Sequence, residues 1–288
     1  MAIKIAEIFG GNKKGGTIQG EGYSGTPSVF VRVFGCNKTC AGFNMPLGEK
    51  STERFQVDPT KYTDFKQLPI LNFGCDSYSS WDPRFKDLSP EQTIEQIVDR
   101  IQNLLRDGKF NQDCHLILTG GEPLLGWQKQ YPELLKEIYN RNMNLTDLTF
   151  ETNGTKKISS ELRRGLCDCY NFHHLNTLFS VSAKLPCSGE TWESSILPEV
   201  VMDYTTIPGS KVYLKFVVSN DEDLNDVKQA EKEYRDAGFK GSIYLMAEGS
   251  NNVNNSHNAT KVAEMAIENG YRYSPRLQCS LWNNKWGF

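Results

Sequence analysis

The sequence lacks several features that mark other classes of protein. It has no excess of one charge, since 35 acidic residues balance 32 basic ones and the net charge is −3. Nucleic-acid binders and membrane-surface proteins usually carry a basic surface, so this balance argues against both classes. No apolar run approaches the roughly 20 residues of a membrane span. Lys4 and Glu7 interrupt the first hydrophobic residues, so we expect no signal peptide and a cytoplasmic location.

Internal repeats, low-complexity tracts and linkers are also absent. Hydrophobic residues make up 38% of the 288 positions, which is enough for a large core. A single domain covering 1–288 is therefore the simplest expectation. An α/β barrel of about 250 residues is one fold of that size.

Strand and helix patterns alternate along much of the chain. An apolar strand is expected at 28–34, then an aperiodic inserted segment at about 41–88, then a helix capped by Ser89 and Gln92 and ended by Gly108. Further strands are predicted in HLILTGG, DLTFETNG, LFSVSAK, KVYLKFVVS, SIYLMAEG and YRYS, most of them separated by helical patterns. Six or seven such strands predict right-handed βα units and a partial TIM-type (β/α)6 barrel with parallel strands.

Chemically distinctive turns follow five of the predicted strands. Their sequences are GCNKTC, TGGEP, ETNG, SAK and MAEG. The carboxyl ends of parallel strands meet at one edge of a barrel, and that edge is where barrel enzymes place their active sites. We therefore expect a functional site at this edge.

Cysteine is the most informative candidate ligand. Eight cysteines occur, at positions 36, 40, 75, 114, 167, 169, 187 and 279. Isolated thiols in a reducing compartment are usually buried, whereas clustered thiols more often bind metal. Three thiolates at Cys36, Cys40 and Cys75 would suit an iron–sulfur cluster with one iron left unligated. Structural thiols or zinc remain alternatives, and the best zinc candidate is the group Cys167, Cys169, His173 and His174.

The order of the motifs resembles a known family. C-x-x-x-C with a third cysteine after the first predicted strand, and GGEP after the second, is similar to the radical S-adenosylmethionine (SAM) superfamily. Within it, TIQGEG, PSVFVRVFGCN, TGGEPLL, ETNGT, SVSAK and SPRLQCSLWNNKWGF resemble the 7-carboxy-7-deazaguanine synthases. The resemblance extends from about residue 5 to the C-terminus in the same order, so the combination is specific although each motif alone is weak.

This resemblance implies a radical reaction. Cys36, Cys40 and Cys75 would hold a [4Fe–4S] cluster whose open iron binds the amino and carboxylate groups of SAM. A 5′-deoxyadenosyl radical would take a hydrogen from 6-carboxy-5,6,7,8-tetrahydropterin, and the ring would contract to 7-carboxy-7-deazaguanine with loss of ammonia. Ser77 would bind Mg²⁺ at a position where relatives usually have threonine. The cofactor would do the difficult chemistry while the protein binds and orients.

The resemblance also assigns further site residues. Glu151 and Arg32 are the expected catalytic residues, because a carboxylate accepts the pterin N–H groups and a guanidinium binds its carboxylate. SAM contacts are expected at Gly121, Ser182, Ala183, Lys184, Met246, Ala247, Glu248 and Gly249. Substrate contacts besides Arg32 are expected at Ile18, Gln19, Gly20, Thr119, Gln278 and Phe288.

The chain departs from the family pattern at three places. The third cysteine follows the second after 34 residues, which predicts an insertion at about 41–74 inside the cluster-binding loop. Loop-closure entropy grows only logarithmically, so this insertion is tolerable. Cys114, the other possible third ligand, precedes a strand and would lie at the wrong end of the barrel. Met246 and Ala247 replace a common Gln-Pro, and Gln278 stands where histidine is expected.

Two other functions remain open at this stage. A radical SAM activase that takes a hydrogen from a glycine of a partner protein would use the same cluster but leave TIQGEG and Arg32 unexplained. A non-enzymatic zinc-binding interaction module is the alternative from a different class. The expected partners of the synthase are the pterin, an electron donor of flavodoxin or ferredoxin type, and a second copy in a homodimer.

Overall fold

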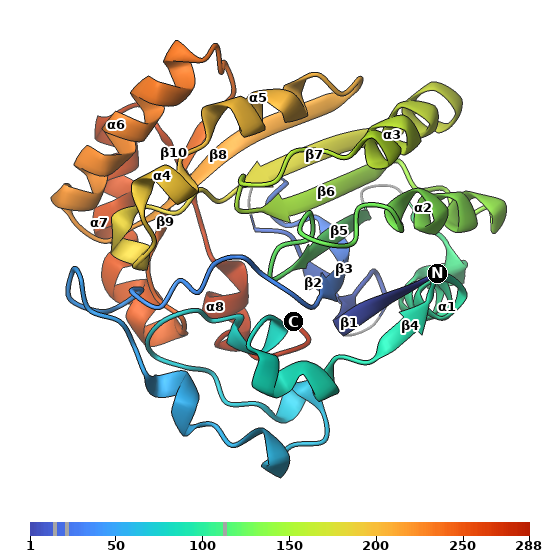
Figure 1. Cartoon of the computed structure of the whole chain (residues 1–288), viewed down its shortest axis with the longest axis horizontal. Helices are drawn as coiled ribbons and strands as arrows, with labels where there is room; N and C mark the ends of the chain where they lie inside the picture. The colour runs from blue at the N-terminus through green and yellow to red at the C-terminus, as the bar shows by residue number, and fades with distance from the viewer. Residues whose placement is uncertain (14–15, 21–22, 112–113) are drawn as a thin grey trace.

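One sheet organises the computed structural model of the chain, which describes residues 1–13, 16–20, 23–111 and 114–288 (Figure 1). Its strands are β1 (Ala2–Gly10), β2 (Thr17–Ile18), β3 (Pro27–Val33), β4 (Glu91–Thr93), β5 (His115–Gly120), β6 (Asp147–Thr152), β7 (Asn176–Val181), β8 (Ser210–Val218), β9 (Ile243–Ala247) and β10 (Arg272–Ser274). Their order is β10-β9-β8-β7-β6-β5-β3-β1-β4, with β2 beside β3. Residues 21–22, the last two of TIQGEG, lie outside the described residues.

Most of this sheet is parallel. Strand β3 pairs in parallel with β5, and the parallel pairing continues through β6, β7, β8 and β9 to β10. Strand β1 runs antiparallel to β3, and the short β4 runs antiparallel to β1. The predicted α/β class with a mostly parallel sheet is therefore confirmed.

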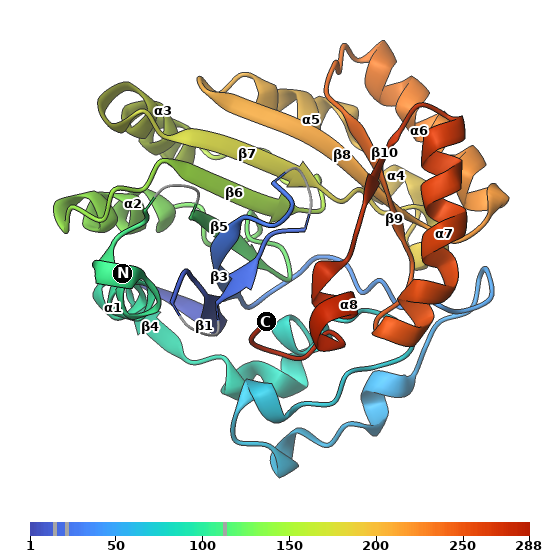
Figure 2. The same ribbon diagram turned by 180° about the vertical axis from the view of Figure 1, so that it is seen from behind.

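Helices cover the outer side of the sheet. They are α1 (Ile94–Leu104), α2 (Tyr131–Asn140), α3 (Ser160–His173), α4 (Trp192–Ser195), α5 (Pro198–Thr205), α6 (Asp221–Asp236), α7 (Asn252–Glu268) and α8 (Leu277–Trp282). Figures 1 and 2 show the strands following a curve, with most helices outside it and α8 and the C-terminus inside. Central strands covered on both faces are buried along nearly their whole length, as β5 is. Among the described residues, no helix is both long enough and apolar enough to cross a bilayer.

Helix α1 begins later than the sequence predicted. Thr93 is its N-cap, and the Thr93 and Gln96 side chains form a reciprocal capping box with each other's backbone N–H groups. The residues before it form β4, which pairs with Ala2–Lys4 of β1. The prediction of Ser89 and Gln92 as the caps was wrong, because residues 91–93 pair with β1 as a strand and the helix can begin only after them. Strand β1 itself was not predicted.

The segment 41–88 contains short 3₁₀ turns and its own small core. The turns are η1 (Glu53–Gln56), η2 (Pro59–Lys61), η3 (Phe65–Gln67), η4 (Tyr78–Ser80) and η5 (Pro83–Leu88). The core contains Ala6, Val57, Phe65, Leu68, Leu71, Tyr78 and Phe85, with Trp286 packed against it. The indole N–H of Trp286 donates to the Leu68 carbonyl at 2.9 Å. The C-terminal segment therefore completes a core that the segment 41–88 does not complete alone.

The ends of the insertion 41–74 are held together by hydrogen bonds. The backbone N–H of Gly74 donates to the Phe43 carbonyl at 2.8 Å. Near the same place, the carboxylate of Glu53 accepts the backbone N–H of Phe73 at 2.8 Å. These bonds close the long loop, and the chain leaves it beside the point where it entered. The third cysteine of the sequence motif follows directly.

Candidate active site

A cavity of about 270 Å³ lies between the carboxyl ends of the strands, the insertion and the C-terminal segment. Most of the site residues expected from the sequence line it. They are Ile18, Gly20, Arg32, Cys36, Cys40, Cys75, Ser77, Thr119, Gly121, Glu151, Ser182, Lys184, Met246, Glu248, Gly249, Gln278 and Phe288. The edge of the sheet at which these residues meet is the one that the turn motifs predicted.

Three expected site residues do not line the cavity. Gln19 is buried, and its side-chain oxygen lies 3.2 Å from Nδ1 of His115. Ala183 and Ala247 are buried as well, and the Ala247 carbonyl accepts a hydrogen bond from Asn255 at 2.8 Å. The direct contacts of these three residues with ligands remain predictions.

The three cysteines of the motif come together at the cavity. All three are free thiols, and burial raises the pKa of Cys36 to about 12 and that of Cys75 to about 11. Burial also raises the pKa of Cys40 well above its usual value, and the thiols of Cys75 and Cys36 add to this rise. Neighbouring thiolates with little solvent around them require compensating positive charge, which iron would supply.

Several N–H groups already point at these sulfurs, among them the side-chain amide of Asn153, 4.0 Å from Cys36 Sγ. The indole N–H of Trp81 donates to Cys75 Sγ at 3.3 Å, and the backbone N–H of Lys38 donates to Cys36 Sγ at 3.4 Å. Hydrogen bonds to cysteine sulfur are a feature of iron–sulfur sites and help to set their potentials. The donors and the three neighbouring thiols therefore fit a cluster.

A mononuclear metal site fits less well. Within the described ranges, no three His, Cys, Asp or Glu residues form a group that could hold one ion. A [4Fe–4S] cluster differs, because each cysteine binds a separate iron and the sulfurs need not converge on one point. The alternative zinc group is also not assembled, since Cys169 packs in the core and His173 stacks on Tyr139 with ring centroids 3.8 Å apart. Cys114 is buried in the core just before β5, away from the cavity.

Glycine at position 121 allows the TGGEP turn to approach the cysteine loop. A Cβ atom at Gly121 would lie 2.2 Å from the Gly35 carbonyl oxygen and 2.8 Å from Cys36 Cβ. Such distances are impossible without moving the backbone. The next residue, Glu122, is buried and accepts hydrogen bonds from Thr152 Oγ1 at 2.7 Å and the Asn153 N–H at 2.6 Å. Glu122 therefore ties two of the predicted turns together.

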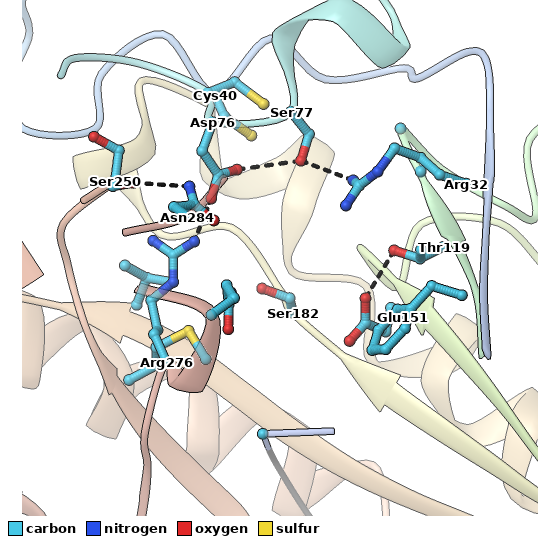
Figure 3. Close-up of a pocket in the computed structure, with 18 of the residues that line it drawn as sticks. Arg32, Cys40, Asp76, Ser77, Thr119, Glu151, Ser182, Ser250, Arg276 and Asn284 are labelled. Carbon is cyan, nitrogen blue, oxygen red and sulfur yellow. Dashed lines mark hydrogen bonds and ion pairs between the residues drawn. The ribbon is translucent and has the colours of Figure 1, made fainter. Parts of the chain in front are cut away.

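A chain of polar contacts crosses the cavity from the C-terminal segment to β1. Arg276 pairs with Asp76 and also donates to the Gly249 carbonyl. Ser77 Oγ donates to Asp76 at 3.2 Å and accepts from Arg32 at 3.1 Å (Figure 3). Burial alone would raise the pKa of Asp76, but the neighbouring Arg276 charge outweighs it and holds that pKa below its usual value.

Arg32 ends this chain against a buried acid. Its Nε lies 3.3 Å from the carboxylate of Glu7, which is only 4% exposed. Burial raises the pKa of Glu7 despite the attraction of Arg32. The guanidinium also lies over the rings of Phe9 and Trp286, at 5.7 and 5.8 Å from their centroids. The Arg32 side chain is therefore held in place by Glu7 and two aromatic rings where it projects into the cavity.

A second polar group lies on the same strand side of the cavity as Arg32. Thr119 Oγ1 donates to Glu151 Oε2 at 2.7 Å, and Figure 3 shows this pair across the cavity from Arg276. At the end of β7, Lys184 Nζ lies 2.9 Å from Ser182 Oγ and donates to it. Arg32 pairs with Thr119 in the strand register, so both come from adjacent strands.

Several residues of this cavity were not predicted from the sequence. Asp76, Arg276, Glu7 and Trp286 were not singled out. The sequence gives a local signal for Asp76, because this carboxylate directly follows the third cysteine, Cys75, and is itself followed by the hydroxyl of Ser77. The other three give no local signal, since their partners are distant in the chain.

Several curated proteins are similar to the chain over nearly its whole length. A 7-carboxy-7-deazaguanine synthase of Halobacterium salinarum is 28% identical, over 98% of this chain and 91% of that protein. Proteins of the same name from Pyrobaculum aerophilum (28% identical, 99% and 97% covered) and Bacillus subtilis (26% identical, 99% and 98% covered) match as fully. No family model and no solved structure gives a match. The resemblance predicted from the ordered motifs is therefore confirmed.

Proposed function

We propose that this chain is a radical SAM enzyme that converts 6-carboxy-5,6,7,8-tetrahydropterin to 7-carboxy-7-deazaguanine with loss of ammonia. The observation that carries the proposal is the meeting of one buried thiol, Cys40, and two partly buried thiols, Cys36 and Cys75, in a cavity lined by polar side chains. Its support from outside the structure is the similarity to enzymes of that name. The fold would be a partial (β/α)6 barrel in a single domain, 1–288, with the insertion 41–74 inside the cluster loop.

Cys36, Cys40 and Cys75 would hold a [4Fe–4S] cluster. When bound, the cluster and SAM would supply the one-electron chemistry that starts the reaction on the pterin. The protein contributes a buried setting in which the indole N–H of Trp81 reaches the sulfur of Cys75. The long insertion is compatible with this role because its ends are tied together before Cys75.

SAM would lie along the strand ends. Gly121 lets the backbone of the TGGEP turn pack directly against Gly35 and Cys36, and this close approach would bring that backbone to the amino group of SAM. Ser182 and Lys184 offer a hydroxyl and an ammonium at the end of β7. Met246 and the segment around Glu248 would contact the nucleoside from β9, and Glu248 is held there by the backbone N–H of Asn44 at 2.8 Å.

The pterin would bind between Arg32 and Glu151. A guanidinium presents five N–H donors, and those of Arg32 that do not contact Glu7 or Ser77 can bind the pterin carboxylate. Glu151, oriented by the Thr119 hydroxyl, is an acceptor that suits the N–H groups of the ring. Trp286 and Phe288 line the same cavity and would exclude water from the bound substrate.

Magnesium fits this arrangement poorly, so no step is assigned to it. Ser77 Oγ accepts an N–H of Arg32, and a guanidinium beside a hydroxyl repels a second cation. The Asp76 carboxylate is also engaged, by Ser77 and by Arg276. A role for Mg²⁺ at Ser77 therefore remains a prediction from the resemblance alone. The cytoplasmic location, the flavodoxin- or ferredoxin-type donor and the homodimer are likewise predictions.

The proposal is tested by turnover under anaerobic conditions. Protein reconstituted with iron and sulfide should convert 6-carboxy-5,6,7,8-tetrahydropterin to 7-carboxy-7-deazaguanine when SAM and a reductant are present, with no net loss of SAM. Product and SAM are both followed by mass spectrometry. Iron and sulfide analysis of the same sample reports whether the cluster is intact.

Three outcomes would reject the proposal. An intact cluster with unchanged pterin would show that the chemistry differs. Zinc in place of iron and sulfide after anaerobic purification would favour a binding module. Stoichiometric deoxyadenosine together with a modified partner protein would instead favour an activase.

A further inference from the structure

Ser180 is a buried hydroxyl that faces the cavity and has no assigned role. It lies on β7, is only 1% exposed, and lines the cavity. Its Oγ has no hydrogen-bond partner among the described residues. Buried hydroxyls are rarely left unpaired, because desolvation without a compensating hydrogen bond is unfavourable. This hydroxyl is therefore suited to a ligand that enters the cavity.

The strand register places Ser180 beside the proposed pterin site. Ser180 pairs with Glu151 in the parallel register of β6 and β7. On the other side of Glu151, Thr119 donates to its carboxylate, and Thr119 in turn pairs with Arg32. Neighbouring strands are about 4.8 Å apart, so these four residues form a row across the sheet. A flat ring that spans the row can touch adjacent members.

Ser182 shows why Ser180 would contact the substrate and not the cofactor. Both serines point to the same face of β7, but they are two residues apart, which is about 7 Å along a strand. Ser182 Oγ accepts from Lys184 at the end of the strand, where the cysteine loop and Gly121 also lie. Ser180 is one layer deeper and level with Glu151.

We propose that Ser180 binds the pterin ring directly, next to the ring atoms held by Glu151. This inference rests on the proposed function and adds a substrate-binding residue to it. A hydroxyl is both a donor and an acceptor, so it can pair with a ring carbonyl or a ring N–H. The ionised Glu151 carboxylate can only accept hydrogen bonds. Glu151 would therefore bind N–H groups of the pterin ring, and Ser180 would bind the neighbouring polar ring atom, whether that atom is a donor or an acceptor.

The test is Ser180→Ala in the reconstituted, full-length protein. The dissociation constant of 6-carboxy-5,6,7,8-tetrahydropterin, measured by titration calorimetry under anaerobic conditions, should rise about 3- to 10-fold, the range for one neutral hydrogen bond. The dissociation constant of SAM should not change. The melting temperature without ligand should stay the same or rise, because the substitution removes an unpaired buried hydroxyl. A residue with a purely structural role would show a lower melting temperature.

Ser89→Ala is the matched control. Ser89 is also a fully buried serine whose Oγ has no partner among the described residues, but it lies before β4 and does not line the cavity. This variant should leave both dissociation constants unchanged.

Equal weakening of pterin and SAM binding in Ser180→Ala, or unchanged pterin binding, would overturn the inference. If wild-type protein turns over the pterin while Ser180→Ala binds it normally, the inference alone fails. If the wild type neither binds nor converts the pterin, both proposals fail.

Discussion

The two walls of the cavity are built in different ways. The strand wall consists of the carboxyl ends of β3 and β5 to β9, whose side chains are positioned by the register of one parallel sheet. The covering wall consists of the insertion 41–74, residues 75–88 and the C-terminal segment 275–288. It is held by contacts between distant segments, such as the ion pair of Asp76 and Arg276 and the bond from Trp286 to Leu68.

The two walls differ in how firmly they are packed. The strand wall packs against the main hydrophobic core, whereas the covering wall rests on a small separate core around Phe65 and Tyr78. Regions with few buried apolar contacts open locally at lower free-energy cost than the main core. The strand wall therefore holds Arg32, Thr119 and Glu151 on a rigid sheet, and the covering wall supplies the third thiol, the Asp76–Arg276 ion pair and the closure of the cavity.

The largest expected effect comes from Cys75→Ala, which removes the only thiol that the covering wall supplies to the predicted cluster. Cluster assembly and turnover should both be abolished, because two thiols would remain for a cluster that needs three. Iron and sulfide content after anaerobic reconstitution measures the loss. The control is Cys114→Ala, which alters a core thiol away from the cavity and should keep its iron. Loss of iron from Cys114→Ala but not from Cys75→Ala would instead assign the third ligand to Cys114 in the core.

Trp286→Ala should loosen the covering wall while the strands of the strand wall stay ordered, although Arg32 loses the ring over which its guanidinium lies. The substitution removes the bond to the Leu68 carbonyl and an edge contact with Phe65, whose ring centroid is 4.7 Å away. A half-buried tryptophan should cost about 2 kcal/mol, less than the roughly 3–5 kcal/mol of a fully buried one. Hydrogen exchange should accelerate in the insertion but not in β5 to β7. Trp282→Ala, outside the small core, is the control. If hydrogen exchange in the insertion accelerated equally in this variant, the effect could not be assigned to the packing of Trp286 on the small core.

Asp82→Asn tests the electrostatic support of the covering wall. Burial alone would raise the pKa of Asp82, but the bonds and charges of Arg84 and Arg54 lower it below its usual value. A lowered folded pKa means that the ionised form contributes stability above the unfolded pKa of about 3.9, and that this stability is lost as pH falls through the folded value. The variant should be about 1–2 kcal/mol less stable near neutral pH, with the difference shrinking in acid. Urea unfolding at several pH values measures it, and a constant difference would contradict the assignment.

Thr119→Val should give the smallest effect and acts on the strand wall. It removes the O–H that orients Glu151 while keeping nearly the same shape. The KM for the pterin should rise about 2- to 5-fold with little change in stability, as expected for one hydrogen bond. Thr149→Val, at a buried hydroxyl outside the cavity, is the control. The same rise in both variants would mean that the effect is structural.

The strand wall was largely predictable because its signals are local. Apolar runs followed by distinctive turns identified β5, β6 and β7, and the turns alone located Thr119, Glu151 and Ser182 at one edge. Strand β1 was missed because Lys4 and Glu7 break its apolar pattern. Glu7 is nevertheless buried, since it pairs with Arg32 on the neighbouring strand.

The sequence by itself determined which turns carry chemistry and that they lie at one edge, because strand and helix periods are properties of short segments and parallel strands share one direction. Only the tertiary structure decided how the covering wall assembles. The pairing of Asp76 with Arg276, the packing of Trp286 on the insertion and the placement of Cys75 beside Cys40 join segments far apart in the chain. No local pattern encodes such partners, because they are selected by the shape and charge that the folded sheet presents.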